Sequence, residues 1–129
     1  MTTTDKRVAR RRLPAEWEAG GVVMMAWPHE ATDWADMLEE VSACYVAMAK
    51  AISEDNGLLI VAPDINEVIP YVSACKGVML VSAETNDTWT RDYGPITVEV
   101  DGRYRLLDYR FNGWGLKFAS DRDNLVNTR

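Results

Sequence analysis

"GVVMMAWP", residues 21–28, is a continuous apolar run that stops at a proline and a histidine. A short run without polar alternation is typical of a strand that is buried on both faces. Two later stretches, "LLIVAP" at 58–63 and "GVMLVSA" at 77–83, have the same character. We therefore predict three buried strands at the centre of the fold.

The segments between these strands have helical periodicity. After the first strand, Thr32 or Asp33 can cap a helix that ends near Glu54, just before an Asn-Gly stop signal. Apolar residues recur along it at steps of three and four and predict one buried face: Trp34, Met37, Leu38, Val41, Tyr45, Met48 and Ile52. After the second strand, Asp64 can cap a shorter helix that ends near Ala74.

A hairpin is predicted after the third strand. "ITVEV" at 96–100 and "YRLLDYRF" at 104–111 flank Asp101-Gly102, a dipeptide typical of tight hairpin turns. Strands and helices alternate before this hairpin, so the predicted class is α/β. The last residues, "DNLVNTR", could open a helix, and we expect the domain to continue beyond Arg129.

Length and composition indicate one soluble domain. The chain has 129 residues, of which 47% are hydrophobic and 26% are charged. Its apolar runs are far shorter than the ~20 residues that span a bilayer, and no apolar stretch follows the basic N-terminus. We therefore expect a cytoplasmic protein with no membrane partner. Cys44, Cys75 and the single His29 lack metal-ligand spacing, so we predict no metal site.

The charge is unevenly distributed. Residues 1–12 hold five of the 14 Lys and Arg residues but one of the 20 acidic residues, and we interpret them as a basic flexible tail. The remainder of the chain is strongly acidic. An acidic body favours a cationic small molecule as ligand and disfavours nucleic acid.

Polar, charged and aromatic side chains are concentrated in "TNDTWTRDYGP", residues 85–95, which follows the third strand at a sheet end. Asp92 can accept two parallel hydrogen bonds from a guanidinium, and Trp89 can offer an aromatic face to a cation. The same residues also fit a structural corner, in which Asp92 pairs with Arg91 or a backbone amide and Trp89 is core. Asn86 and Asp87 are typical turn formers. Residue types alone leave both alternatives open.

Four stretches occur together in order: "LPAEWE" (13–18), "MMAWPHE" (24–30), "TNDTWTRDYGPI" (85–96) and "FNGWGLKF" (111–118). In combination they resemble the N-terminal part of agmatine deiminases and of the related bacterial-type peptidylarginine deiminases. The resemblance implies a partial pentein fold, roughly the first two of five ββαβ-type units around a central site. It also implies that residues 13–129 are the N-terminal portion of a deiminase domain that is incomplete at its C-terminus.

The resemblance further implies a reaction and a site. The family hydrolyses a guanidinium to a ureido group with release of ammonia, as from agmatine to N-carbamoylputrescine, and it needs no cofactor or metal. Asp92 matches the catalytic aspartate that grips the guanidinium, Trp89 matches the wall of the substrate slot, and Trp114 matches a supporting substrate-binding position. The catalytic cysteine and histidine belong to motifs that this chain lacks, and neither Cys44 nor Cys75 takes their place. We therefore expect the chain to be inactive alone.

Other functions are consistent with the same residues. One is peptidylarginine deiminase activity on peptide arginine. Another is a non-catalytic protein, either a guanidinium-binding module or a remnant that pairs with another subunit. The full-length protein could form a homo-oligomer.

Overall fold

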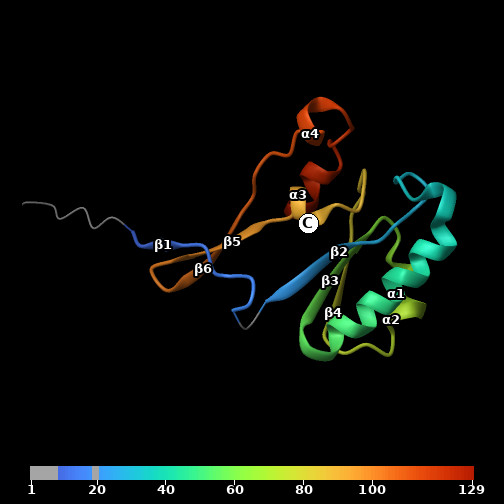
Figure 1. Ribbon diagram of the computed structural model, residues 1–129, viewed down its shortest axis with the longest axis horizontal. Helices are drawn as coiled ribbons and strands as arrows, with labels where there is room; N and C mark the ends of the chain where they lie inside the picture. The colour runs from blue at the N-terminus through green and yellow to red at the C-terminus, as the bar shows by residue number, and fades with distance from the viewer. Residues whose placement is uncertain (1–8, 19–20) are drawn as a thin grey trace, which may run out of the picture.

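The computed structural model describes residues 9–18 and 21–129, and its centre is a three-stranded parallel sheet (Figure 1). The strands lie in the order β2-β3-β4, with β3 hydrogen-bonded to both neighbours. Their bounds are β2 (Val22–Ala26), β3 (Gly57–Ala62) and β4 (Val78–Ser82). All three predicted strands are confirmed, and so is the α/β class, but the predicted burial holds fully only for β3, since β4 has no buried residue and β2 begins with two exposed valines.

One face of this sheet is covered by α1 (Leu38–Asp55) and α2 (Ile69–Val72), as Figure 1 shows. The core between them is apolar, and its buried members are Met25, Trp27, Ala49, Leu58, Ile60, Ala62, Val68 and Val72. Trp27 adds aromatic contacts, edge-on to Tyr45 at 5.9 Å and stacked on Tyr71 at 6.0 Å between ring centroids. We call this set the helix-side core.

The start of the first helix differs from the prediction. A 3-10 turn, η1 (Ala35–Met37), precedes α1, and neither Thr32 nor Asp33 caps the helix. Most of the predicted buried face is retained on α1, where Tyr45 and Ile52 pack against the helix-side core. Met37 and Met48 are exposed, whereas Ala49 is fully buried.

The second helix is divided into two short pieces. Asp64 accepts a hydrogen bond from the Asn66 N–H and so caps the 3-10 turn η2 (Ile65–Glu67), as predicted. The α-helix that follows is the four-residue α2 (Ile69–Val72), which contains Pro70. Proline has no N–H and disfavours a helical residue before it. One continuous helix to Ala74 is therefore wrong.

The opposite face of the parallel sheet is covered by a second apolar core. Its buried members are Ala26, Val61, Ala83, Tyr93 and Val126. Tyr93 comes from the short helix α3 (Thr90–Tyr93) and Val126 from the 3-10 helix η3 (Asp123–Thr128). The sheet therefore separates α3 from α1 and α2.

The predicted hairpin is confirmed, with β5 (Ile96–Val100) antiparallel to β6 (Arg103–Leu107). Asp101 and Gly102 both have positive φ, 49° and 76°, as a primed hairpin turn requires. β6 ends at Leu107 and does not continue to residue 111. The two-residue strand β1 (Arg11–Arg12) pairs with β5. Of the predicted flexible tail, residues 1–8 lie outside the described residues, and Arg11 and Arg12 belong to a sheet.

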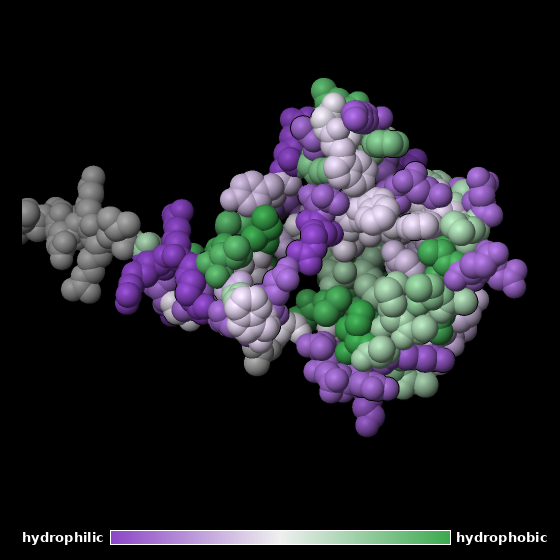
Figure 2. Space-filling view, in the orientation of Figure 1, coloured by the Kyte–Doolittle hydropathy of each residue, from purple (hydrophilic) through white to green (hydrophobic). Residues whose placement is uncertain are grey.

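Apolar side chains stay exposed on the side of the parallel sheet that bears α3. Figure 2 shows these residues on the hairpin and the lower part of the parallel sheet, with a hollow between them. The hollow is lined by Val22, Leu59, Met79, Tyr104 and Leu106, among others.

No helix within residues 9–18 and 21–129 is long and apolar enough to cross a membrane.

Candidate functional site

Trp89 and Asp92 lie on one tight turn at the start of α3. The Asp92 N–H donates to the Trp89 carbonyl at 3.0 Å, and the Gly94 N–H donates to the Thr90 carbonyl at 2.7 Å. The Thr90 hydroxyl donates to the Met24 carbonyl at 3.1 Å, which ties the turn to β2. A Cβ at Gly94 would lie 2.5 Å from the Thr90 carbonyl oxygen, so the turn requires glycine there. The backbone therefore holds Trp89 and Asp92 in a fixed relation.

The Asp92 carboxylate is available to a ligand. Asp92 is exposed, and within the described part of the chain its carboxylate oxygens accept no hydrogen bond. Arg91 does not pair with Asp92, because its guanidinium donates to Glu16 Oε1 at 2.8 Å. Trp89 is 44% exposed and is not a core residue. The structural-corner alternative would need Asp92 to be paired and Trp89 to be buried, and neither is observed among the described residues.

The Trp34 ring packs against the Trp89 ring. Their ring centroids lie 6.0 Å apart with an interplanar angle of 39°. The Trp34 indole Nε1–H also donates to the Thr88 hydroxyl oxygen at 2.8 Å, and His29 Nε2 lies 2.9 Å from the Thr85 hydroxyl oxygen. The segment after β2 therefore fixes residues 85–93, which we call the site loop. The sequence placed Trp34 on the buried face of a helix, and its spacing gave no sign of this contact.

Trp114 lies in a left-handed turn, α4 (Gly113–Leu116). All four residues have positive φ: 62° at Gly113, 55° at Trp114, 79° at Gly115 and 67° at Leu116. Such backbone is costly for residues with a side chain. Strained backbone clusters at functional sites, although it does not by itself define one.

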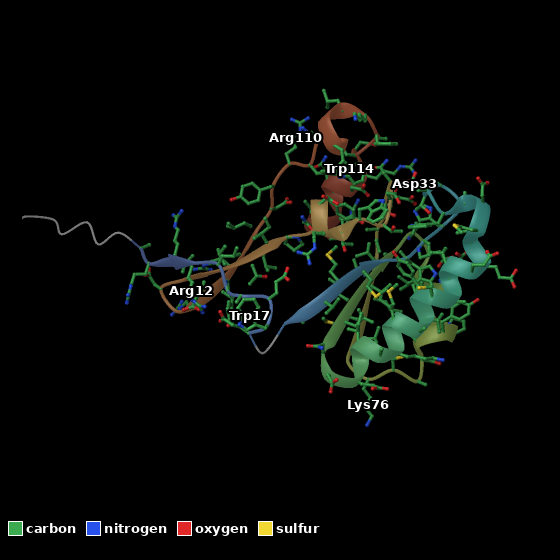
Figure 3. All side chains as sticks on the ribbon, viewed as in Figure 1. Arg12, Trp17, Asp33, Lys76, Arg110 and Trp114 are labelled. Atoms are coloured by element: carbon green, nitrogen blue, oxygen red, sulfur yellow. The ribbon has the colours of Figure 1, made fainter. Side chains whose placement is uncertain are left out.

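Aromatic contacts connect Trp114 to α3. The Trp114 ring is edge-on to Phe111 at 4.9 Å and to Phe118 at 5.7 Å, and Phe111 lies 6.3 Å from Tyr93. Figure 3 shows Trp114 near the α4 turn, on the side of the molecule where α3 also lies. Trp89 and Asp92 thus lie on the same turn. Trp114 is connected to that turn only through the rings of Phe111 and Tyr93.

The site loop also contains a buried carboxyl that faces the protein. Asp87 is 8% exposed and accepts the Thr88 N–H at 2.8 Å. Burial raises the pKa of Asp87, and the nearby Asp33 carboxylate raises it further, although the Thr88 hydrogen bond acts in the opposite direction. Tyr93 donates its hydroxyl to the Asp87 carbonyl at 2.9 Å. Asp87 is therefore a structural acceptor, but it binds the next N–H along the chain and not the one two residues on, as a typical Asx turn would.

Neither cysteine lies near Asp92. Cys44 is exposed on α1, and Cys75 packs against the helix-side core, so both lie across the sheet from α3. Neither is placed to attack a group held by Asp92. In the described part of the chain, no group of three His, Cys, Asp or Glu side chains could hold a metal ion.

Sequence comparison identifies the relatives of this chain. Residues 12–129 match the family described as Porphyromonas-type peptidyl-arginine deiminase. A protein from Shewanella baltica, provisionally named agmatine deiminase, is 32% identical over 125 residues, which cover 88% of this chain and 32% of the relative. One from Lactococcus lactis with the same provisional name is 32% identical, with 89% and 33% covered. The chain thus spans about a third of the length of these relatives.

Solved structures give the same result. The C. jejuni agmatine deiminase with a C315S substitution and substrate bound has a TM-score of 0.88 and 36% identity, over 95% of this chain and 36% of that one. The agmatine deiminase of Enterococcus faecalis has a TM-score of 0.75 and 32% identity, over 90% and 33%. The predicted fold, a part of the pentein fold, is thereby confirmed.

Proposed function

Because this chain belongs to the Porphyromonas-type peptidyl-arginine deiminase family, we propose that it forms the guanidinium-binding part of an agmatine deiminase. The reaction would be hydrolysis of agmatine to N-carbamoylputrescine and ammonia. One observation carries the proposal: the Asp92 carboxylate is exposed and unpaired within the described residues, on the same turn as the exposed Trp89 ring. The fold similarity to a substrate-bound agmatine deiminase supports it.

The two residues have distinct roles in this proposal. Asp92 accepts hydrogen bonds from two guanidinium N–H groups, which fixes the plane of the guanidinium and leaves its central carbon open on one face. Trp89 offers a flat apolar wall beside the cation, supported by Trp34. Trp114 would contribute a further wall from the α4 turn. The acidic character of the chain attracts the cationic substrate.

The bond-breaking groups are proposed to come from elsewhere. A deiminase of this family needs a cysteine thiolate to attack the guanidinium carbon and a histidine to move protons. Cys44 and Cys75 lie across the sheet from Asp92. We propose that residues 13–129 are the first portion of a larger domain, and that the exposed apolar hollow lined by Val22, Met79 and Leu106 is covered by its later units. The 129-residue chain alone should then bind agmatine without hydrolysing it.

Isothermal titration calorimetry with agmatine tests the binding role. Asp92→Asn keeps the shape of the side chain but removes its charge. A charge-assisted hydrogen bond at an exposed site contributes about 1–2 kcal/mol, so the Kd should rise roughly 5- to 30-fold. Asp55→Asn at the end of α1 is the matched control, because it removes the same charge far from α3. Equal affinities for wild type and Asp92→Asn would refute the role of Asp92.

The substrate class has a separate test. A deiminase on peptide arginine would bind an arginine-containing peptide more tightly than free agmatine. The proposal predicts the reverse order in the same calorimeter. Tighter binding of the peptide would move the assignment to the peptidylarginine branch and would leave the role of Asp92 intact.

A further inference from the structure

The most deeply buried charged side chain in the described part of the molecule is Asp123, at the start of η3. It is 1% exposed, and nothing in the proposed chemistry uses it. Its Oδ1 atom accepts the Asn86 N–H at 2.7 Å and the Asp87 N–H at 3.3 Å. A buried carboxylate oxygen aimed at two successive backbone amides holds those two amides in place.

The contact is reciprocal. Asn86 Oδ1 accepts the backbone N–H of Arg122 at 2.8 Å and that of Asp123 at 3.0 Å. The Asn86 Nδ2–H also donates to Asp121 Oδ1 at 3.1 Å. Each partner thus binds the backbone of the other, across 36 or 37 residues of sequence. A pair of this kind fixes the orientation as well as the distance between two segments.

The same short helix holds the far end of the site loop. Asn127 Nδ2–H donates to the Tyr93 carbonyl at 2.8 Å, and Val126 packs in the core that contains Tyr93. η3 therefore contacts residues 86 and 87 before Trp89, and residue 93 after Asp92. The two residues proposed to bind the guanidinium lie between these anchors.

We propose that Asp123 is a positioning residue, which sets the orientation of Trp89 and Asp92 by fixing the backbone of Asn86 and Asp87. The inference rests on the proposed function, since it assigns the loop a ligand. Asp123 does not touch the ligand. Its effect on binding passes through the site loop.

A trio of variants tests the proposal. Asp123→Ala removes the acceptor, whereas Asp123→Asn keeps an oxygen at the same place. Val72→Ala is the control for lost stability, because Val72 is 5% exposed in the helix-side core, across the sheet from the site loop. Each variant is titrated with agmatine, and the exchange of the Asn86 and Asp87 amide protons is followed by NMR.

The expected result is specific to the acceptor oxygen. Asp123→Ala should raise the Kd for agmatine at least tenfold and accelerate exchange of both amides by a similar factor. Asp123→Asn should stay within about threefold of wild type in both measurements. Val72→Ala should unfold at lower urea and keep the wild-type Kd. Wild-type binding and exchange in Asp123→Ala, or equal losses in Asp123→Ala and Asp123→Asn, would overturn the proposal.

The two claims can fail separately. If the wild-type chain binds no agmatine, the proposed function fails in this chain. The amide exchange still decides whether Asp123 fixes the site loop. Protected amides in Asp123→Ala would refute the positioning role whatever the calorimetry shows.

Discussion

Leu116 has left-handed backbone, so we expect Leu116→Gly to stabilise the protein. Its φ is 67°, and its side chain is 86% exposed. Left-handed backbone costs a residue with a side chain about 1–2 kcal/mol, which glycine avoids. The greater freedom of glycine in the unfolded chain takes back about 0.5–1 kcal/mol. Because little apolar area is lost, the free energy of unfolding should rise by about 0.5–1 kcal/mol.

Urea unfolding followed by tryptophan fluorescence measures this change. Leu106→Gly is the matched control, since Leu106 is also exposed, at 69%, but lies in the extended strand β6. Glycine weakens a strand, so this variant should lose about 1 kcal/mol. Opposite signs for the two substitutions would support the left-handed turn. A loss of stability in Leu116→Gly comparable to that in Leu106→Gly would mean that the left-handed backbone at Leu116 is not strained.

Three further predictions concern single residues. Trp34→Phe keeps a ring beside the site loop but loses the hydrogen bond to Thr88. The free energy of unfolding measured in urea should fall by about 1 kcal/mol, and calorimetry should show weaker binding of agmatine. Unchanged values in both measurements would exclude this supporting role. Burial raises the pKa of Asp123 above its ordinary value of 3.8, so the folded state holds the proton more tightly. The contribution of Asp123 to the free energy of unfolding should therefore fall as pH rises from the ordinary to the raised pKa. In urea titrations over this range, stability should change less favourably with rising pH in wild type than in Asp123→Asn. Gly113→Ala should lower the free energy of unfolding by at least about 2 kcal/mol in the same urea assay. The reason is that φ is 62° at Gly113 and the new Cβ would lie 2.1 Å from the Phe118 carbonyl oxygen. An unchanged free energy of unfolding would contradict the turn geometry.

The sheet was predictable because its three strands are almost wholly apolar in sequence. β3 lies between two cores and has no polar side, and "GVVMMAWP", "LLIVAP" and "GVMLVSA" are nearly continuous apolar runs. The hairpin was predictable for a different local reason, since Asp101-Gly102 readily adopts positive φ at both positions. Both signals lie within a few residues of the structure that they specify.

The features that the sequence did not reveal depend on distant contacts. Trp34 and Thr88 are 54 residues apart, and Asn86 and Asp123 are 37 apart. Neither spacing carries a periodic signal. The α4 turn could be suspected from Gly113 and Gly115, but Leu116 has no tendency to adopt positive φ. Trp89 and Asp92 were identified as candidates from their chemistry, and the exposure of both was decided only by the three-dimensional structure.

NMR observation of the Asp92 carboxyl carbon during an agmatine titration shows whether this carboxylate binds the guanidinium. The Trp89 indole N–H and the Asp55 carboxyl carbon are followed in the same samples. If Asp92 and Trp89 bind the guanidinium, their signals shift together with one Kd, while the Asp55 signal stays in place. Binding that leaves the Asp92 carboxyl carbon unmoved would contradict the assignment of this carboxylate as the guanidinium ligand.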